Sequence, residues 1–257
     1  MNKSTLSVVL AAHNEEKNIK DCLDSVKSIA DEMIVVDSES SDNTGRIAKN
    51  CGAKVIRTKN YPIFHINKNI AIDTATKDWV LQMDADERIS PALAKEIKTS
   101  TADSEFNGYW IPRKNYFLGR FLTKGGQYPD YTLRLYRRGK GRLPAKDVHE
   151  QAEVQGEVGY LKNNLLHYRD LSFTKYLEGL NRYTDLISTQ IKQAGVMVNP
   201  ITFLNYMVVK PGWWFLMTYF RHKGVVDGFP GFVFALFSSL RFPIAYIKMW
   251  SINANRN

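Results

Sequence analysis

An apolar run that ends on two carboxylates, Trp79 to Glu87, constrains the fold more than any other stretch. An unpaired carboxylate in a buried core is costly, so Asp84 and Asp86 must emerge at the carboxyl end of a buried strand, where α/β sheets bind ligands. Residues i and i+2 of an extended backbone share one side, so we expect Asp84 and Asp86 to hold one cation while Ala85 points away. Oxygen ligands spaced in this way suit Mg²⁺ or Mn²⁺ holding a diphosphate. A capped strand end with acids in a turn has the same short pattern, so other parts of the chain are needed to distinguish a metal site from a turn.

Strands and helices alternate over the first hundred residues. Asn14 is the expected cap of the first helix, because Asn side chains accept hydrogen bonds from the first helical N–H groups. The pattern predicts an α/β fold with a mostly parallel sheet and right-handed crossovers. The expected strands cover 6–11, 33–36, 53–56 and 108–112, and the expected helices cover 19–29, 44–50 and 91–99.

Asp37 directly follows the second expected strand. An acid at this place in a βαβ unit often hydrogen-bonds the ribose or base of a nucleotide, although an ordinary turn acid would look the same. No Gly-rich phosphate loop follows the first strand, which argues against a dinucleotide-binding enzyme or a P-loop NTPase. Phosphate charge would then be met by a metal ion and by cationic side chains.

Four segments, taken in their order and spacing, resemble family 2 glycosyltransferases of the Rossmann-like GT-A fold. They are Ala11–Glu16, Val35–Thr44, Lys68–Ala71 and Met83–Glu87. The resemblance covers roughly the first ninety residues. It implies an enzyme that moves a sugar from a nucleotide diphosphate donor with inversion at the anomeric carbon.

The same resemblance implies roles for individual residues. Asp84 and Asp86 would lie at the metal and the diphosphate. The base, the ribose and the rest of the nucleotide would lie against Ala11, Asn14, Glu15, Asp37, Lys68 and Asn69.

Inverting transfer is a single in-line displacement, so a base must take the proton of the acceptor hydroxyl as its oxygen attacks. In the family that the chain resembles, an acid after a strand with Arg-Leu-Tyr, here Arg134 to Tyr136, serves as this base. Glu150 is our first choice, Asp147 the second and Asp130 the third. A solvated Glu150 paired with a neighbouring cation would be equally ordinary.

His167 and the arginines of the later strand complete the candidate site. A metal in a hard-oxygen site can take one imidazole, and His167 follows an apolar strand-like run, although an isolated His is more often structural. Arg134 or Arg137 would assist the ion at the diphosphate, and His149 would position Glu150 or a phosphate. The pair His149–Glu150 and the segment Leu166–Tyr168 resemble a branch that includes bacterial lipopolysaccharide inner-core glucosyltransferases.

The formal net charge of +9 is concentrated near the carboxyl end. Residues 159–257 hold 11 Lys and Arg against 4 Asp and Glu, whereas residues 1–158 hold 24 against 22. These cations are diluted among apolar and aromatic runs, which favours an anionic membrane surface over nucleic acid as the partner. Cys22 and Cys51 make no disulfide framework, which fits a reducing cytoplasm.

We expect a catalytic domain at 1–165 and a helical region at 166–257, beginning with an amphipathic helix at 173–192. Charges and Pro211, Pro230 and Pro243 interrupt the later apolar runs, so a spanning helix is not expected. Aromatic helices flanked by cations lie at the lipid headgroups, here as a peripheral protein on the inner face of the cytoplasmic membrane. A helical cap on the catalytic domain or a homo-oligomer contact would account for the same composition.

The sequence therefore predicts a metal-dependent inverting hexosyltransferase with UDP-glucose as the expected donor. The expected acceptor is a glycolipid, such as a lipopolysaccharide inner-core intermediate. A peptide or a polyprenyl phosphate is the alternative acceptor. A nucleotide- or membrane-binding scaffold without catalysis is the alternative from a different class.

Overall fold

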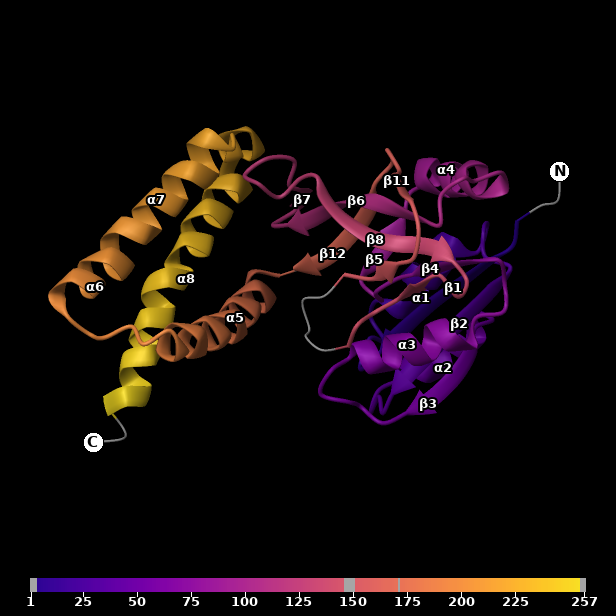
Figure 1. Cartoon of the computed structure of the whole chain (residues 1–257), viewed down its shortest axis with the longest axis horizontal. Helices are drawn as coiled ribbons and strands as arrows, with labels where there is room; N and C mark the ends of the chain where they lie inside the picture. Colours follow the sequence, from indigo (N-terminus) through magenta and orange to yellow (C-terminus); the bar gives the residue numbers. More distant parts are fainter. Residues whose placement is uncertain (1–3, 146–150, 171, 255–257) are drawn as a thin grey trace. The chain divides into compact units, whose positions relative to one another are not determined.

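The computed structural model of the chain describes residues 4–145, 151–170 and 172–254 (Figure 1). The chain forms two compact units. Unit 1 consists of Met1–Lys114 and Asp130–Tyr168, and unit 2 consists of Asn115–Pro129 and Arg169–Asn257. Unit 2 therefore includes an internal segment, 115–129, in addition to the carboxyl-terminal region.

A sheet and four helices make up most of unit 1. The helices are α1 (Ile19–Val26), α2 (Thr44–Asn50), α3 (His65–Thr74) and α4 (Pro91–Ala102). The strands, some of which continue into unit 2, are β1 (Leu6–Ala12), β2 (Glu32–Ser38), β3 (Lys54–Thr58), β4 (Trp79–Gln82), β5 (Glu87–Ile89), β6 (Gly108–Phe117), β7 (Arg120–Phe121), β8 (Asp130–Arg137), β9 (Gly141–Arg142), β10 (Glu153–Val154), β11 (Val158–Tyr160) and β12 (Leu165–Asp170).

The main sheet has the order β3-β2-β1-β4-β8-β6-β12-β5. Strands β3, β2, β1 and β4 are parallel, which confirms the predicted α/β sheet. From β8 onward the pairing of β8 with β4 and β6, and of β12 with β5, is antiparallel. The carboxyl ends of β1, β2 and β4 therefore meet at one edge, as the alternation of strands and helices predicts.

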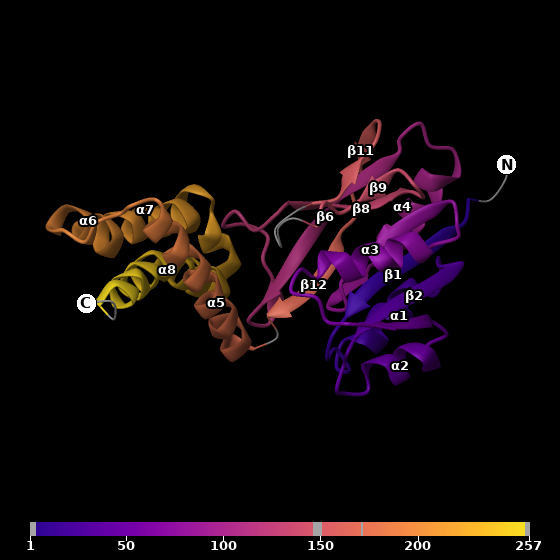
Figure 2. The ribbon, with the colours of Figure 1, turned by 60° about the horizontal axis from the view of Figure 1, so that its bottom comes forward.

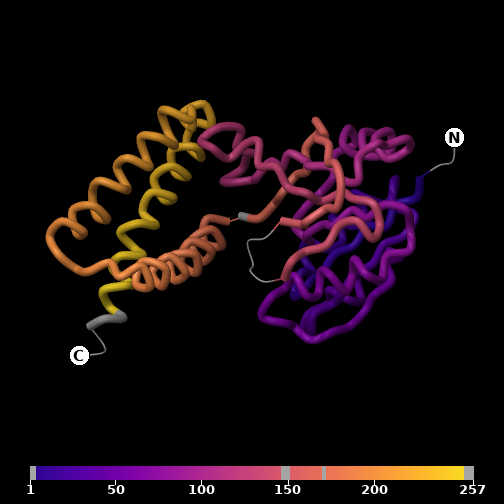
Figure 3. Tube along the Cα trace, in the orientation of Figure 1, coloured from indigo at the N-terminus to yellow at the C-terminus, as the bar shows by residue number. Residues whose placement is uncertain are grey.

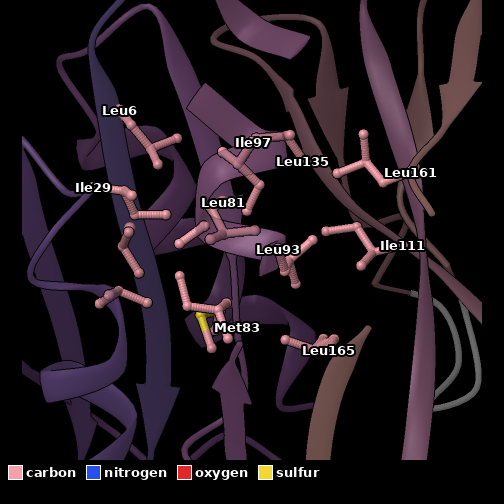
Figure 4. Close-up of a cluster of buried hydrophobic side chains, with 14 of the residues drawn as sticks. Leu6, Ile29, Leu81, Met83, Leu93, Ile97, Ile111, Leu135, Leu161 and Leu165 are labelled. Atoms are coloured by element: carbon pink, nitrogen blue, oxygen red, sulfur yellow. The ribbon is translucent and has the colours of Figure 1, made fainter. Parts of the chain in front are cut away.

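Helices cover both faces of the parallel strands (Figure 2). On one face, Leu81 and Met83 pack with Leu93 and Ile97 of α4, together with α1 (Figure 4). On the opposite face, Val80 packs in a cluster with α3. The two faces alternate along β4 because successive side chains of a strand point to opposite sides.

Unit 2 is helical apart from its share of β6, β7 and β12, and Figure 3 lets the reader follow its trace. Its elements are α5 (Phe173–Gln193), α6 (Pro200–Leu204), the π-helical η1 (Asn205–Val209), α7 (Lys210–Leu216), the π-helical η2 (Met217–Arg221), the 3₁₀ turn η3 (Gly224–Asp227) and α8 (Gly228–Ala254).

The three prolines that interrupt the later apolar runs of the sequence do not interrupt the helices. Pro211 lies in the first turn of α7, Pro230 lies near the start of α8, and Pro243 lies inside α8. Pro230 loses no hydrogen bond within α8, because the first N–H groups of a helix have no partner within it. Pro211 follows the π-helical η1 inside a continuous helical segment. Among the described residues, one helix, Gly224–Ser251, is long and apolar enough by length and composition to cross a membrane.

One buried carboxylate fastens the internal segment of unit 2 to its helices. Asp227 accepts hydrogen bonds from the backbone N–H of Thr123 at 2.9 Å and of Lys124 at 2.8 Å. The Thr123 hydroxyl donates to it at 2.8 Å, and Arg120 Nη2 lies 3.3 Å from Oδ1. A short loop is thus held by a side chain that is 1% exposed.

Candidate active site

The acids of the 83–87 segment lie in a turn. β4 ends at Gln82, and the Glu87 backbone N–H donates to the Asp84 carbonyl at 3.0 Å. The Asp84 N–H in turn donates to Glu87 Oε2 at 2.9 Å. The expectation of an extended backbone through Asp86 is therefore wrong, because the Glu87 side chain stabilises a turn there. Ala85 is 5% exposed and packs in an apolar cluster with residues of β1 and α1.

Two cations from other elements hold the Asp84 carboxylate. Lys68 of α3 pairs with Oδ1, and Arg134 Nη2 of β8 lies 2.5 Å from Oδ2. Arg134 reaches this point because β8 pairs with β4 along the sheet. Burial by itself raises the pKa of Asp84, but the charges of Arg134 and Lys68 outweigh it and hold that pKa well below its usual range. Asp84 therefore stays ionised.

The network continues to Glu87, which is fully buried. Its Oε1 lies 3.2 Å from Arg134 Nη2 and 3.5 Å from Arg113 Nη1. Arg113 also donates from Nε at 2.9 Å and from Nη2 at 2.8 Å to Asp130 Oδ2. Nothing in the sequence pattern assigned a role to Glu87 or Arg113. The only signal was a third acid directly after the pair of aspartates.

Asp86 meets a different partner from Asp84. Its Oδ2 lies 3.5 Å from Nε2 of His167, and both side chains are largely buried. β12 places His167 there by pairing antiparallel with β5, with His167 opposite Glu87. The Tyr168 N–H also donates to the Asp86 carbonyl at 2.8 Å. The structure thus brings together two of the three predicted metal ligands.

The donor set of Asp86 and His167 fits a divalent ion that other ligands complete. Mn²⁺ accepts both carboxylate oxygen and imidazole nitrogen, and Mg²⁺ prefers oxygen. No group of three or more His, Cys, Asp or Glu among the described residues could hold an ion. Such ions commonly take one or two protein ligands, with phosphate oxygens and water in the remaining positions. The pair therefore suits an ion bound together with a diphosphate.

Asp37 lies at the carboxyl end of β2, buried and 1% exposed. Its Oδ1 accepts from the Ser40 N–H at 3.1 Å, and Arg57 Nε lies 3.7 Å from Oδ2. A Cβ at Gly45 would lie 2.6 Å from that same oxygen, so α2 can approach the carboxylate only with glycine there. These contacts fix the carboxylate at the edge of the sheet.

The ends of β1 and β2 lie side by side. Ala11 pairs with Val36, and the next pair is Ala12 with Asp37. Asn14 has a φ of 55° and its Oδ1 accepts from the Ser41 N–H at 2.8 Å. α1 begins only at Ile19, so the predicted helix-capping role of Asn14 is wrong; its side chain joins the two loops instead.

Glu15 lies in the same pair of loops. Its backbone N–H donates to the Thr44 hydroxyl at 2.7 Å, and its carboxylate accepts from Asn18 at 2.8 Å. The residues predicted to contact the base and ribose, Asn14, Glu15 and Asp37, therefore lie together at the ends of β1 and β2.

Comparisons with known proteins agree with this geometry. The family described as glycosyl transferase family 2 matches residues 7–153. The chain belongs to glycosyl transferase family 2. An uncharacterized glycosyltransferase of Rickettsia typhi is 30% identical over 240 residues, covering 89% of this chain and 80% of that protein.

Two further proteins are similar to this chain, one in sequence and one in fold. The lipopolysaccharide core biosynthesis glycosyltransferase LpsC of Rhizobium meliloti is 30% identical over 241 residues, covering 91% of this chain and 87% of LpsC. The crystal structure of Staphylococcus aureus TarS 1–349 superposes with a TM-score of 0.50 and 16% identity, covering 95% of this chain and 88% of that one. The second likeness concerns the fold alone, and it agrees with the predicted GT-A architecture.

Of the predicted site residues Asn69, Arg134 and Arg137 of this family 2 glycosyltransferase, only Arg134 contacts Asp84. The Asn69 amide donates to the Leu143 carbonyl at 2.8 Å and accepts from its N–H at 3.1 Å, so it anchors the chain leading to residue 145. Arg137 donates to the Ser104 carbonyl at 2.7 Å and lies over the Trp79 ring. Arg134, and not Arg137, therefore joins Asp84.

Of the three candidate catalytic bases, the structure describes only Asp130. Glu150 and Asp147, as well as His149, fall outside the residues that the structure describes. Asp130 is described, and its Oδ2 accepts two hydrogen bonds from Arg113. A carboxylate engaged in this way is poorly placed to accept a proton from a hydroxyl. Glu150 and Asp147 stay predictions.

Proposed function

We propose that the chain transfers a hexose from a nucleotide-sugar donor, UDP-glucose, to a glycolipid acceptor such as a lipopolysaccharide inner-core intermediate, with inversion at the anomeric carbon. Membership of family 2 supports glycosyl transfer. The name and coverage of LpsC support lipopolysaccharide core synthesis as the setting. The observation that carries the proposal is the single sheet edge that gathers Asp37, Asp84 and Asp86.

The nucleoside and the diphosphate of the donor each have proposed partners at this edge. Asp37 and the loops of Asn14 and Glu15 would hold the ribose and base. Lys68 and Arg134, the two cations at Asp84, are donors suited to diphosphate oxygens. Asp86 and His167, with Asp84, are the proposed ligands of Mg²⁺ or Mn²⁺, which when bound acts as a Lewis acid that offsets charge on the leaving diphosphate.

The remaining catalytic task is proton removal from the acceptor hydroxyl. Glu150 is the proposed base, with Asp147 second, as an acid following β8. The proton passes to this carboxylate as the hydroxyl oxygen attacks the anomeric carbon, and the nucleotide diphosphate leaves on the opposite face. Arg113 and Glu87 keep the metal-binding turn and Arg134 in place through the buried ion pairs described above.

A glycolipid acceptor places the reaction at the inner face of the cytoplasmic membrane. The positive excess of residues 159–257 supports this location, because cations near the surface are attracted to anionic lipids. A water-soluble peptide acceptor gives no reason for such a charge distribution.

The test is a panel of nucleotide sugars with Mn²⁺ or Mg²⁺, scored by release of nucleotide diphosphate with and without membrane lipid extract. The proposal expects UDP release from UDP-glucose, stimulated by the lipid extract and lost in Asp86→Asn. Stimulation by peptides or by polyprenyl phosphate alone would move the function to those acceptors. No cleavage of any donor would indicate a binding scaffold instead of an enzyme.

A further inference from the structure

The outward side of one helical segment of unit 2 carries no polar side chain. Residues 200–221 are helical without a break, through α6, η1, α7 and η2. Its exposed side chains recur at intervals of three and four residues, which defines one side of a helix. This apolar face consists of Ile201, Leu204, Val208, Val209, Trp213, Leu216 and Phe220, each at least 52% exposed.

The exposed face of this segment is apolar, whereas the exposed face of a helix in water is normally polar. The structure describes all of residues 201–220, and no exposed side chain among them is charged or polar. A surface helix normally puts charged and polar residues on its outer side. Contiguous exposed apolar area of this length, about 30 Å at 1.5 Å per residue, marks an interaction surface.

The charges of residues 186–257, which include the apolar face, are mostly positive. From residue 186 to residue 257 the sequence contains one acid, Asp227, against seven Lys and Arg. Asp227 is 1% exposed and lies 3.3 Å from Arg120. Arg221 and Lys223 are exposed at the end of the segment. One of the seven cations, Lys248, is paired with the exposed Asp185 of α5 at 2.7 Å. The positive excess that remains complements anionic lipid headgroups.

Aromatic rings hold two further cations of unit 2. Lys210 Nζ lies 3.6 Å from the centroid of the Tyr206 ring, and the Arg241 guanidinium carbon lies 3.8 Å from that of Trp214. Aromatic side chains and long cationic ones both favour the boundary between lipid and water. The segment thus combines an apolar face with the residues that settle at headgroup depth.

We propose that residues 200–221 lie along the surface of an anionic membrane with the apolar face in contact with lipid. The assignment of the cytoplasmic leaflet, but not the lipid contact, rests on the proposed function. A second copy of the chain is a poorer occupant, because two such basic surroundings facing each other would repel. The acceptor's lipid tail would then stay in the membrane while its sugar is modified.

Flotation of the whole chain with vesicles tests the proposal without any sugar. Vesicles of phosphatidylglycerol and phosphatidylethanolamine are compared with phosphatidylcholine vesicles. The double variant Trp213→Ser/Leu216→Gln removes the centre of the apolar face and is expected to weaken binding by about tenfold or more. Arg221→Gln is expected to weaken binding to the anionic vesicles by about fivefold and to change binding to phosphatidylcholine little.

Tyr160→Gln is the matched control, because Tyr160 is an exposed aromatic residue of unit 1, at 62%. It should bind vesicles like the unaltered chain. Donor cleavage by the double variant shows that it is folded. If the unaltered chain binds vesicles but cleaves no donor, the proposed function fails and the lipid contact stands. Unchanged flotation of the double variant would overturn the lipid contact. So would a dimer in vesicle-free buffer that the double variant converts to a monomer, since a second copy would then cover the face.

Discussion

Nε2 of His167 in β12 lies 3.5 Å from Oδ2 of Asp86 in the turn after β4. Eighty residues lie between them in the sequence, and β5 brings them together by pairing with β12. Because His167 is one of three proposed protein ligands of the ion, beside Asp86 and Asp84, His167→Ala removes one donor and leaves two carboxylates. We expect the Mn²⁺ concentration for half-maximal donor cleavage to rise by about tenfold or more, at little change in the rate at saturating metal.

The matched control for this prediction is His222→Ala, which removes an exposed histidine of unit 2. It should leave the Mn²⁺ dependence unchanged. An unaltered Mn²⁺ requirement in His167→Ala would assign that histidine a purely structural role beside Asp86.

Arg134→Ala should destabilise unit 1. The change leaves Asp84 and the fully buried Glu87 without their shared guanidinium, and breaking a buried ion pair costs about 3–5 kcal/mol. Arg134→Lys keeps the charge but loses the forked geometry, so its loss should be smaller. Hydrogen exchange of the β4 and β8 amides measures the free energy of opening, and Arg138→Ala, an exposed neighbour on the same chain segment, should change it little. Equal exchange in the Arg134 and Arg138 variants would contradict the buried network.

Asp84 should make the fold sensitive to acid. Its pKa in the folded chain lies below the usual value, so its contribution is fully present above the unfolded pKa of about 3.9. That contribution is lost as the pH falls from about 4 towards the folded pKa, because the unfolded state binds the proton first. In Asp84→Asn the stability should fall less steeply below pH ~4 than in the unaltered chain. The readout is the denaturation midpoint measured at each pH, and parallel slopes would refute the depressed pKa.

Asp227→Ala should loosen the internal segment of unit 2. The substitution leaves the N–H groups of Thr123 and Lys124 and the cation of Arg120 without their buried acceptor. A lost buried acceptor costs about 1–3 kcal/mol for each unsatisfied donor that water does not reach. Limited proteolysis near residues 120–124 should accelerate, whereas Asp185→Ala, which removes an exposed partner of Lys248, should not accelerate it.

The parallel half of the fold could be predicted from the sequence because each of its elements carries its own pattern. The helix 44–50 has the predicted bounds, and the strand at 6–11 is extended by one residue. Apolar periodicity and the acids at strand ends are local signals. These signals alone suffice to place Asp37, Asp84 and Asp86 at one sheet edge.

Contacts made by long-range pairing could not be predicted in the same way. Glu87 and Arg113 are distant in sequence, and neither has a local pattern that signals a buried ion pair. The turn at Asp84 depends on the Glu87 side chain, so periodicity wrongly extended the strand. In unit 2, prolines interrupt the apolar runs of the sequence, and yet α7 and α8 contain them.

We expect the edge formed by Asp84, Asp86 and His167 to bind the diphosphate of the donor through a divalent ion. Titration calorimetry of UDP into the whole chain, with and without Mn²⁺, tests it most directly. We expect Mn²⁺ to tighten UDP binding by about tenfold or more, and Asp86→Asn to remove that gain. UDP binding of equal strength with and without Mn²⁺, or an undiminished Mn²⁺ effect in Asp86→Asn, would contradict the account.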